Sequence, residues 1–70
     1  MVDVYKLKGK MAERGLNTRK LAKAIDIPEQ TMYAKFSSGN FGCKDAKKII
    51  NELALTVEES YAIFFAEQVS

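Results

Sequence analysis

The chain has 70 residues, of which 47% are apolar and 29% are charged, and its net charge is +2. This length provides material for one hydrophobic core, and the apolar share is too high for a solvated disordered tail, so we expect one folded domain over residues 1–70. No apolar run approaches the roughly 20 residues that span a bilayer, and the first ten residues lack the apolar core of a signal peptide. These features argue against a membrane protein or an enzyme with a large cleft, and they predict a cytoplasmic location.

Residue types that commonly perform catalysis or bind metals are scarce. The chain contains no histidine and a single cysteine, Cys43, so it cannot form an intramolecular disulfide, and a zinc site would have to be built from carboxylates. Without histidine there is no His-based triad or general base, and the other ionisable side chains form no recognisable catalytic motif. We therefore expect no enzymatic activity, no metal, no cofactor and no small-molecule substrate. Cys43 is interpreted as a small residue at the start of a helix.

The charges are distributed unevenly along the chain. Residues 1–25 contain seven Lys or Arg and two acidic side chains, whereas residues 51–70 contain four Glu and no basic residue. The first segment therefore carries a net charge of +5 and the last a net charge of −4. This asymmetry allows one end of the molecule to face phosphate groups while the other avoids them.

The first half of the chain predicts two helices. Apolar residues recur at spacings of three and four along residues 4–14, and Gly15 follows where a left-handed residue commonly ends a helix. Asn17 is a suitable N-cap for a second, short helix over residues 18–25, whose outward side is basic.

A tight turn is expected between the second helix and a third. Asp26 tolerates a positive φ better than most residues, and Pro28 suits the first turn of a new helix. Over residues 29–37, Met32 and Phe36 are four apart, which places them on one side and leaves a polar opposite side.

Two more helices complete the prediction. Residues 37–42 form a short loop inside the domain, and residues 44–53 have the apolar spacing of a fourth helix. Thr56 and Glu59 form a T-x-x-E capping box for the last helix. No segment has the alternation of a strand, so the predicted fold class is all-α with five helices.

The second and third helices have the features of a helix-turn-helix. Two short helices joined by a turn of three or four residues cross steeply when a small residue lies at their contact and the turn accepts unusual backbone angles. Ala22 and Asp26 meet these two requirements. The third helix would then protrude, and a major groove about 12 Å wide can accept it.

The stretch around these residues, L-N-T-R-K-L-A-K-A-I-D-I-P-E-Q-T-M-Y, resembles the helix-turn-helix of lambda-repressor-like regulators, which include phage repressors and Cro-type proteins. The downstream stretch F-G-C-K-D-A-K-K-I-I-N-E-L-A-L-T-V-E-E-S-Y-A-I-F-F is similar to the tail of small regulators from Gram-positive phages and prophages. The resemblance covers nearly the whole chain and implies a five-helix lambda-repressor-like domain. It also implies a sequence-specific transcriptional regulator that occupies a double-stranded DNA operator in a bacterial host cell.

Three positions depart from the family pattern. Asp26 stands where the family usually has Gly, Pro28 where it has Ser or Gly, and Lys35 where it has an aliphatic residue. We expect Phe36 to take over the packing role of that last position.

The resemblance also implies which residues meet DNA. Glutamine can form two hydrogen bonds with adenine, and a carboxylate can accept one from cytosine N4. The predicted base-contacting residues are Glu29, Gln30, Thr31, Tyr33 and Ser37. Hydroxyls, amides, helix-terminal N–H groups and basic side chains suit phosphate oxygens, which predicts contacts of the DNA backbone with Asn17, Thr18, Arg19, Lys20, Lys35, Ser38 and Asn40.

Several of these features have a simpler interpretation. A polar helix face is most often only solvated, Tyr33 could equally pack at the edge of the core, and the lysines at 6, 8 and 10 fit the wet side of an amphipathic helix. The last helix carries more apolar surface than one short helix usually buries. We interpret Tyr61, Phe64 and Phe65 as a homodimer interface, with simple closure of the core as the alternative.

A second hypothesis for the whole chain belongs to another class. A protein-interaction module of the antirepressor or antitoxin kind could keep the fold without binding DNA. The modest net charge, Glu29 and the aromatic last helix favour it.

Overall fold

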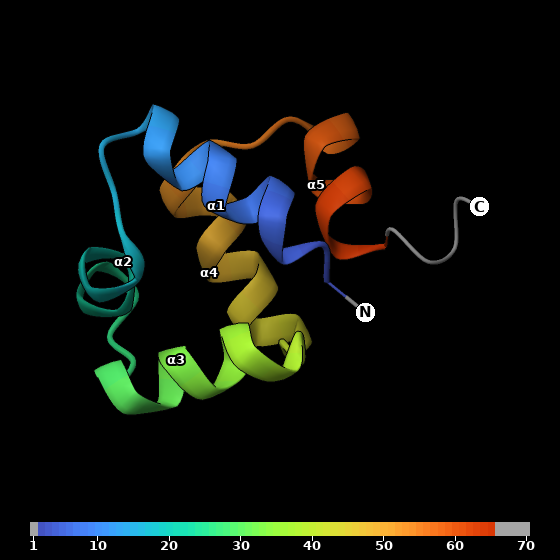
Figure 1. Cartoon of the computed structure of the whole chain (residues 1–70). Helices are drawn as coiled ribbons and strands as arrows, with labels where there is room; N and C mark the ends of the chain where they lie inside the picture. The colour runs from blue at the N-terminus through green and yellow to red at the C-terminus, as the bar shows by residue number, and fades with distance from the viewer. Residues whose placement is uncertain (1, 66–70) are drawn as a thin grey trace.

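The computed structural model describes residues 2–65, and this part of the chain contains five α-helices and no strand (Figure 1). The helices are α1 (Val4–Glu13), α2 (Thr18–Ala24), α3 (Glu29–Ser38), α4 (Cys43–Leu53) and α5 (Val57–Phe64). The predicted all-α class is confirmed, and the helix ends that the sequence predicted agree with the observed ones to within one residue. The loop predicted over residues 37–42 begins two residues later, because α3 continues through Ser38. Among the described residues, no helix is long and apolar enough to cross a membrane.

Side chains cap the start of three helices. Asn17 Oδ1 accepts a hydrogen bond from the Lys20 amide at 2.8 Å, and Thr56 and Glu59 form the predicted capping box. Asp3, which the sequence analysis did not identify as a cap, accepts from the Lys6 amide at 3.1 Å. Each cap satisfies an amide that has no partner inside its helix, which explains where α1, α2 and α5 begin.

Three helices end in the same way, at a residue with positive φ followed by an aliphatic residue. The left-handed residues are Gly15 at φ 72°, Asp26 at φ 57° and Ala54 at φ 50°. The amide of the next residue then donates back to a carbonyl of the helix, in the pairs Leu16 to Met11, Ile27 to Ala22 and Leu55 to Ile50. This arrangement is the Schellman motif, and it returns the aliphatic side chain to the core.

The core collects apolar side chains from all five helices. Leu7, Leu21, Met32, Ile49 and Leu53 are completely buried. Phe41, from the loop after α3, meets Phe36 and Phe64 edge to face, with ring centroids 5.3 and 6.4 Å away. Phe64 is only 8% exposed, so the structure assigns it to the core and not to the exposed dimer face suggested by the sequence.

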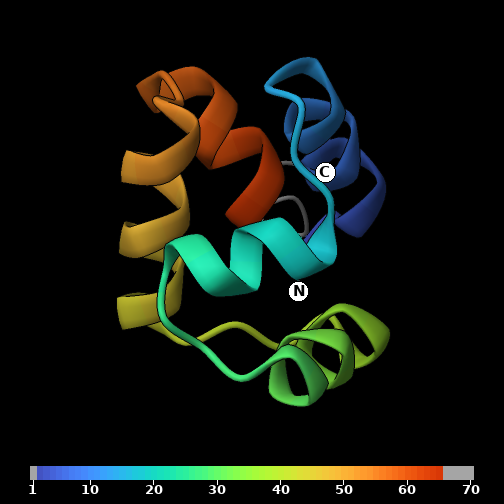
Figure 2. The same ribbon diagram turned by 90° about the vertical axis from the view of Figure 1, so that its left-hand side faces the viewer.

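Helices α2 and α3 cross steeply. Figure 1 looks along the axis of α2 while α3 runs across the view, and in Figure 2 the two are exchanged. The residues of the turn, 25–28, bring the chain from one helix to the other, and Ala22 is 2% exposed where the helices pack. In both views α3 occupies one end of the molecule, so its outer side faces away from the other helices.

Polar contacts join helices that are distant in sequence. Arg14 Nε donates to the carbonyl of Leu53 at 2.9 Å, which joins the ends of α1 and α4. Lys10 of α1 pairs with Glu59 of α5, and this hydrogen bond, together with the Thr56 amide, lowers the pKa of Glu59 to about 2. The same hydrogen bond raises the pKa of Lys10 above its ordinary value.

Candidate nucleic-acid interface

The outer side of α3 is polar and exposed. Met32 and Phe36, which are 0% and 7% exposed, attach the inner side of the helix to the core. All the residues predicted to contact bases are exposed, namely Glu29, Gln30, Thr31, Tyr33 and Ser37. Because each residue of an α-helix turns by about 100°, Gln30 and Ser37 lie near the middle of this side, opposite Met32.

One residue of this surface was not predicted from the sequence. Ala34 is exposed and lies one turn after Gln30, on the same side of α3. Its spacing from Gln30 and Ser37 is a signal for the same side of the helix, but alanine has no hydrogen-bonding group that would mark it as a base-contacting residue. A methyl at this place can contact the C5-methyl of thymine, so Ala34 belongs to the candidate surface.

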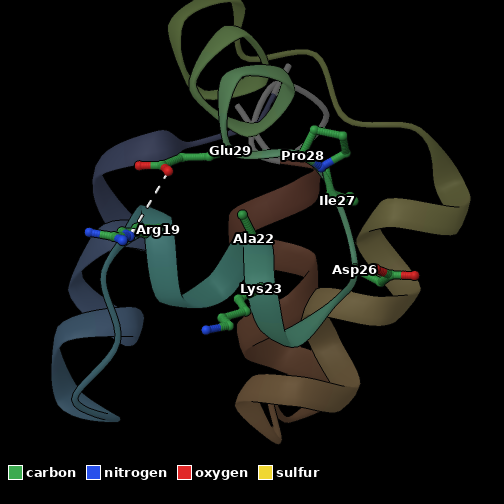
Figure 3. A pocket seen from close by; sticks show the side chains of 7 residues that line it. All are labelled: Arg19, Ala22, Lys23, Asp26, Ile27, Pro28 and Glu29. Atoms are coloured by element: carbon green, nitrogen blue, oxygen red, sulfur yellow. Dashed lines mark ion pairs between the residues drawn. The ribbon is translucent and has the colours of Figure 1, made fainter.

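Glu29 and Tyr33 lie along one edge of the α3 surface. Tyr33 is 52% exposed, which favours the surface position over the core position that the sequence left open. Glu29 faces Arg19 of α2, with its Oε2 4.0 Å from Arg19 Nε (Figure 3). This exposed ion pair contributes little to stability, but it places a cation beside the one carboxylate of the α3 surface.

The start of α2 supplies several of the residues predicted to contact the DNA backbone. Arg19 and Lys20 are exposed, with the Arg19 side chain at 78%, and Thr18 is half-buried. Asn17 is exposed, and its carbonyl oxygen is used as the cap of α2. Its NH₂ group is the part of the side chain that can donate to a phosphate oxygen.

Lys35 is held differently from what the sequence suggested. Its Nζ lies 2.7 Å from Asp45 Oδ2, and both side chains are largely buried, at 25% and 18% exposure. The ion pair joins α3 to the first turn of α4. Lys35 therefore has a role in the fold that the sequence did not predict, and a contact with the DNA backbone would require its ammonium to share or leave this ion pair.

At the end of α3 and in the loop that follows, one residue predicted to contact the DNA backbone is free to do so and another is engaged in hydrogen bonds within the protein. Asn40 is exposed. Ser38 is also exposed, but its hydroxyl donates to the Lys35 carbonyl at 3.4 Å and accepts from the Asn40 amide at 3.2 Å. A hydroxyl has one hydrogen to donate, so Ser38 would have to break an internal bond to donate to phosphate.

The steep crossing of α2 and α3 leaves an open notch of about 570 Å³ (Figure 3). Arg19 and Lys23 line it from α2, and Ile27 and Pro28 line it from the turn. Ala22 points from α2 toward α3 in this view, and its small side chain is what lets the two helices approach. The notch is thus a consequence of the crossing that exposes α3.

The exposed part of α5 differs from the one expected. Tyr61 and Phe65 are 49% and 47% exposed, and their ring centroids are 5.4 Å apart. Val57, one turn before Tyr61, is 84% exposed. Val57, Tyr61 and Phe65 together form an exposed apolar stripe along α5.

Comparisons of the chain with protein-family models, with curated proteins and with solved structures found no match. The residues and contacts described above are therefore the basis for the function.

Proposed function

We propose that this protein is a sequence-specific DNA-binding regulator of the lambda-repressor-like kind, with α2 and α3 as its helix-turn-helix. The proposal rests on one observation above all, which is that α3 presents an exposed polar side while Met32 and Phe36 anchor the opposite side in the core. A helix held in this way can enter a major groove without any change in the fold.

Base recognition is assigned to the middle of the α3 surface. Gln30 can donate to adenine N7 and accept from adenine N6, and Ala34 and Ser37 lie on the same side of the helix. Glu29 can accept from cytosine N4. Its carboxylate would otherwise be repelled by phosphate, and the adjacent Arg19 offsets that repulsion.

The non-specific part of the affinity is assigned to the start of α2. Arg19 and Lys20 are exposed cations at the start of α2, and Arg19 lies next to the α3 surface, 4.0 Å from Glu29. Each phosphate contact that they make releases counterions from the DNA. Binding is therefore expected to weaken steeply with salt. The acidic α5 belongs to the part of the chain that carries no basic residue and would face away from the duplex.

Selection from a random pool of duplexes, followed by a gel shift with Gln30→Ala, tests the proposal. We expect the wild-type protein to enrich a defined site, and Gln30→Ala to lower the affinity for it by roughly 1–3 kcal/mol while leaving binding to unrelated DNA unchanged. Asn51→Ala is the matched control, because it also removes an exposed amide side chain, from α4. Equal binding of the selected site by wild type and Gln30→Ala would contradict the assignment of α3.

The exposed stripe of α5 favours a partner protein as well. We propose that a second copy of this chain covers Val57, Tyr61 and Phe65, because two copies would present two α3 surfaces to two half-sites. The alternative is the interaction module of the antirepressor or antitoxin kind. It requires that the protein bind a different polypeptide and retard no DNA at low salt, so the same gel shift separates the two functions.

A further inference from the structure

The structure changes the interpretation of one lysine of α1. A groove of about 450 Å³ runs between the N-terminal part of α1 and the C-terminal end of α3. Tyr5 and Lys8 line it from α1, and Ser37 and Ser38 line it from α3. Ser37 also belongs to the α3 surface, so the groove is continuous with the candidate DNA interface.

The ammonium of Lys8 is directed toward α3. Its Nζ lies 5.8 Å from the centroid of the Phe36 ring, within the range of a cation–π contact. Phe36 is buried and packs edge to face against Phe41, so its ring provides a fixed support. Lys8 is nevertheless an exposed residue, and its charge is accessible at the groove.

The neighbouring lysines of α1 are engaged in a different way. Lys10 pairs with Glu59 and Glu13, and Lys6 lies 4.0 Å from Asp3. Asp3 also lines the groove and would oppose an anion, but its carboxylate caps α1 and is paired with Lys6. Among the described residues, Lys8 differs from Lys6 and Lys10 because its ammonium lies beside α3 and contacts an aromatic ring, whereas theirs pair with carboxylates.

The length of α3 places phosphates near this groove. A helix of 10 residues is about 15 Å long, whereas the major groove is about 12 Å wide. When the middle of α3 contacts bases in the major groove of the DNA, an end of the helix reaches the sugar–phosphate strand that borders the major groove. Tyr5, which is 89% exposed, and Lys8 stand beside the C-terminal end.

We propose that Lys8 and Tyr5 bind the phosphates of the DNA strand that passes the C-terminal end of α3. This inference rests on the proposed function and extends the interface from α2 and α3 to α1. Lys8 supplies the charge, and the hydroxyl of Tyr5 donates a hydrogen bond to a phosphate oxygen. The two strands that border the major groove are then held at opposite ends of α3, one by Arg19 and Lys20 of α2 and the other by Tyr5 and Lys8 of α1.

Two charge-matched variants test the inference on a selected duplex of about 20 base pairs, two helical turns. Lys8→Met removes the charge and keeps a side chain that can cover Phe36, and Lys48→Met removes one exposed charge from α4. For Lys8→Met we expect roughly five- to tenfold weaker binding near 0.1 M salt, and a slope of log K against log salt that is shallower by about 0.9. Lys48→Met is expected to bind like wild type.

Two further variants keep the test independent of folding. Lys8→Arg retains the cation and should retain the affinity and the slope. Tyr5→Phe changes only an exposed hydroxyl, so it should leave the thermal unfolding temperature and the slope unchanged and lower the affinity about fivefold.

The outcomes separate this inference from the proposed function. If wild type binds no duplex at low salt, the proposed function fails and the inference fails with it. If wild type binds its selected site but Lys8→Met and Lys48→Met bind equally well, only the contact from α1 is overturned. Removing the part of the duplex that passes the C-terminal end of α3 should abolish the difference in affinity between Lys8→Met and wild type. A difference that persists on the shortened duplex would also overturn the contact from α1.

Discussion

Ala54 and Asp26 are the two residues other than glycine that the described chain holds at positive φ, and both end a helix. The left-handed conformation costs an alanine about 1–2 kcal/mol, so Ala54 stores strain that packing compensates, whereas Asp adopts this conformation more readily. Asp26 could be predicted, because Asp tolerates this conformation and stands where the resembling family has Gly. Ala54 could not, because alanine has no such preference. The burial of Leu55, at 9% exposure, explains why the chain turns there.

Replacing Ala54 with Gly is expected to stabilise the protein. Gly removes the strain at φ 50°, which stabilises the folded state. The greater freedom of Gly in the unfolded chain offsets part of this gain, so the free energy of unfolding should rise by about 0.5–1 kcal/mol. Urea denaturation followed by helical circular dichroism measures the change. Ala12→Gly, at an exposed position inside α1, is the control and should cost about 1 kcal/mol. A destabilised Ala54→Gly variant would show that residue 54 is not strained.

At the scale of the elements, α1 and α5 are joined by the ion pair of Lys10 with Glu59. The residues are 49 positions apart in the sequence, so no local pattern predicts that they meet. The capping box of α5 was predicted because Thr56 and Glu59 are separated by the spacing that this motif requires. One side chain, Glu59, therefore performs a local task that the sequence reveals and a tertiary task that it does not.

The low pKa of Glu59 predicts how stability depends on pH. Its folded pKa of about 2 is below the ordinary value of 4.5, so its contribution is complete above pH 4.5 and is lost as the pH falls toward 2. Glu59→Gln keeps an acceptor for the Thr56 amide and removes the ion pair. The variant should unfold at a lower temperature than wild type at neutral pH, and the difference should disappear near pH 2.

Thermal unfolding of wild type and Glu59→Gln across this pH range provides the measurement. Glu58→Gln, which neutralises an exposed carboxylate in the same turn of α5, should follow wild type. A gap between wild type and Glu59→Gln that did not change with pH would mean that the pair with Lys10 is not the cause.

At the scale of the whole molecule, the helices beside α3 are basic, whereas α5, which carries the exposed stripe, is acidic. The basic first third of the chain contributes α1 and α2 beside α3, and the acidic last part contributes α5. A dimer formed through α5 would leave both α3 surfaces accessible to DNA. This arrangement agrees with the proposal of a regulator that reads two half-sites.

If two copies associate through the stripe of α5, a single substitution in the stripe should disrupt the dimer. Tyr61→Ser removes half-exposed aromatic surface from the middle of the stripe and should shift the sedimentation of the protein from two copies to one. Tyr5→Ser removes a more exposed tyrosine from α1 and should leave the assembly unchanged. Sedimentation as a single copy by the wild-type protein at high concentration would refute the dimer.

The sequence alone was sufficient to predict five helices, the caps at Gly15, Asn17 and Thr56, the left-handed Asp26 and the polar side of α3. These features depend on residues within one or two turns of each other, so periodicity and capping chemistry reveal them. The tertiary structure decided which side of the fold Lys8 faces, that Lys35 pairs with Asp45, and that Phe64 is buried while Phe65 is half exposed. Periodicity defines the apolar side of each helix to within a residue or so, but the angle at which helices pack determines which neighbours its boundary residues meet.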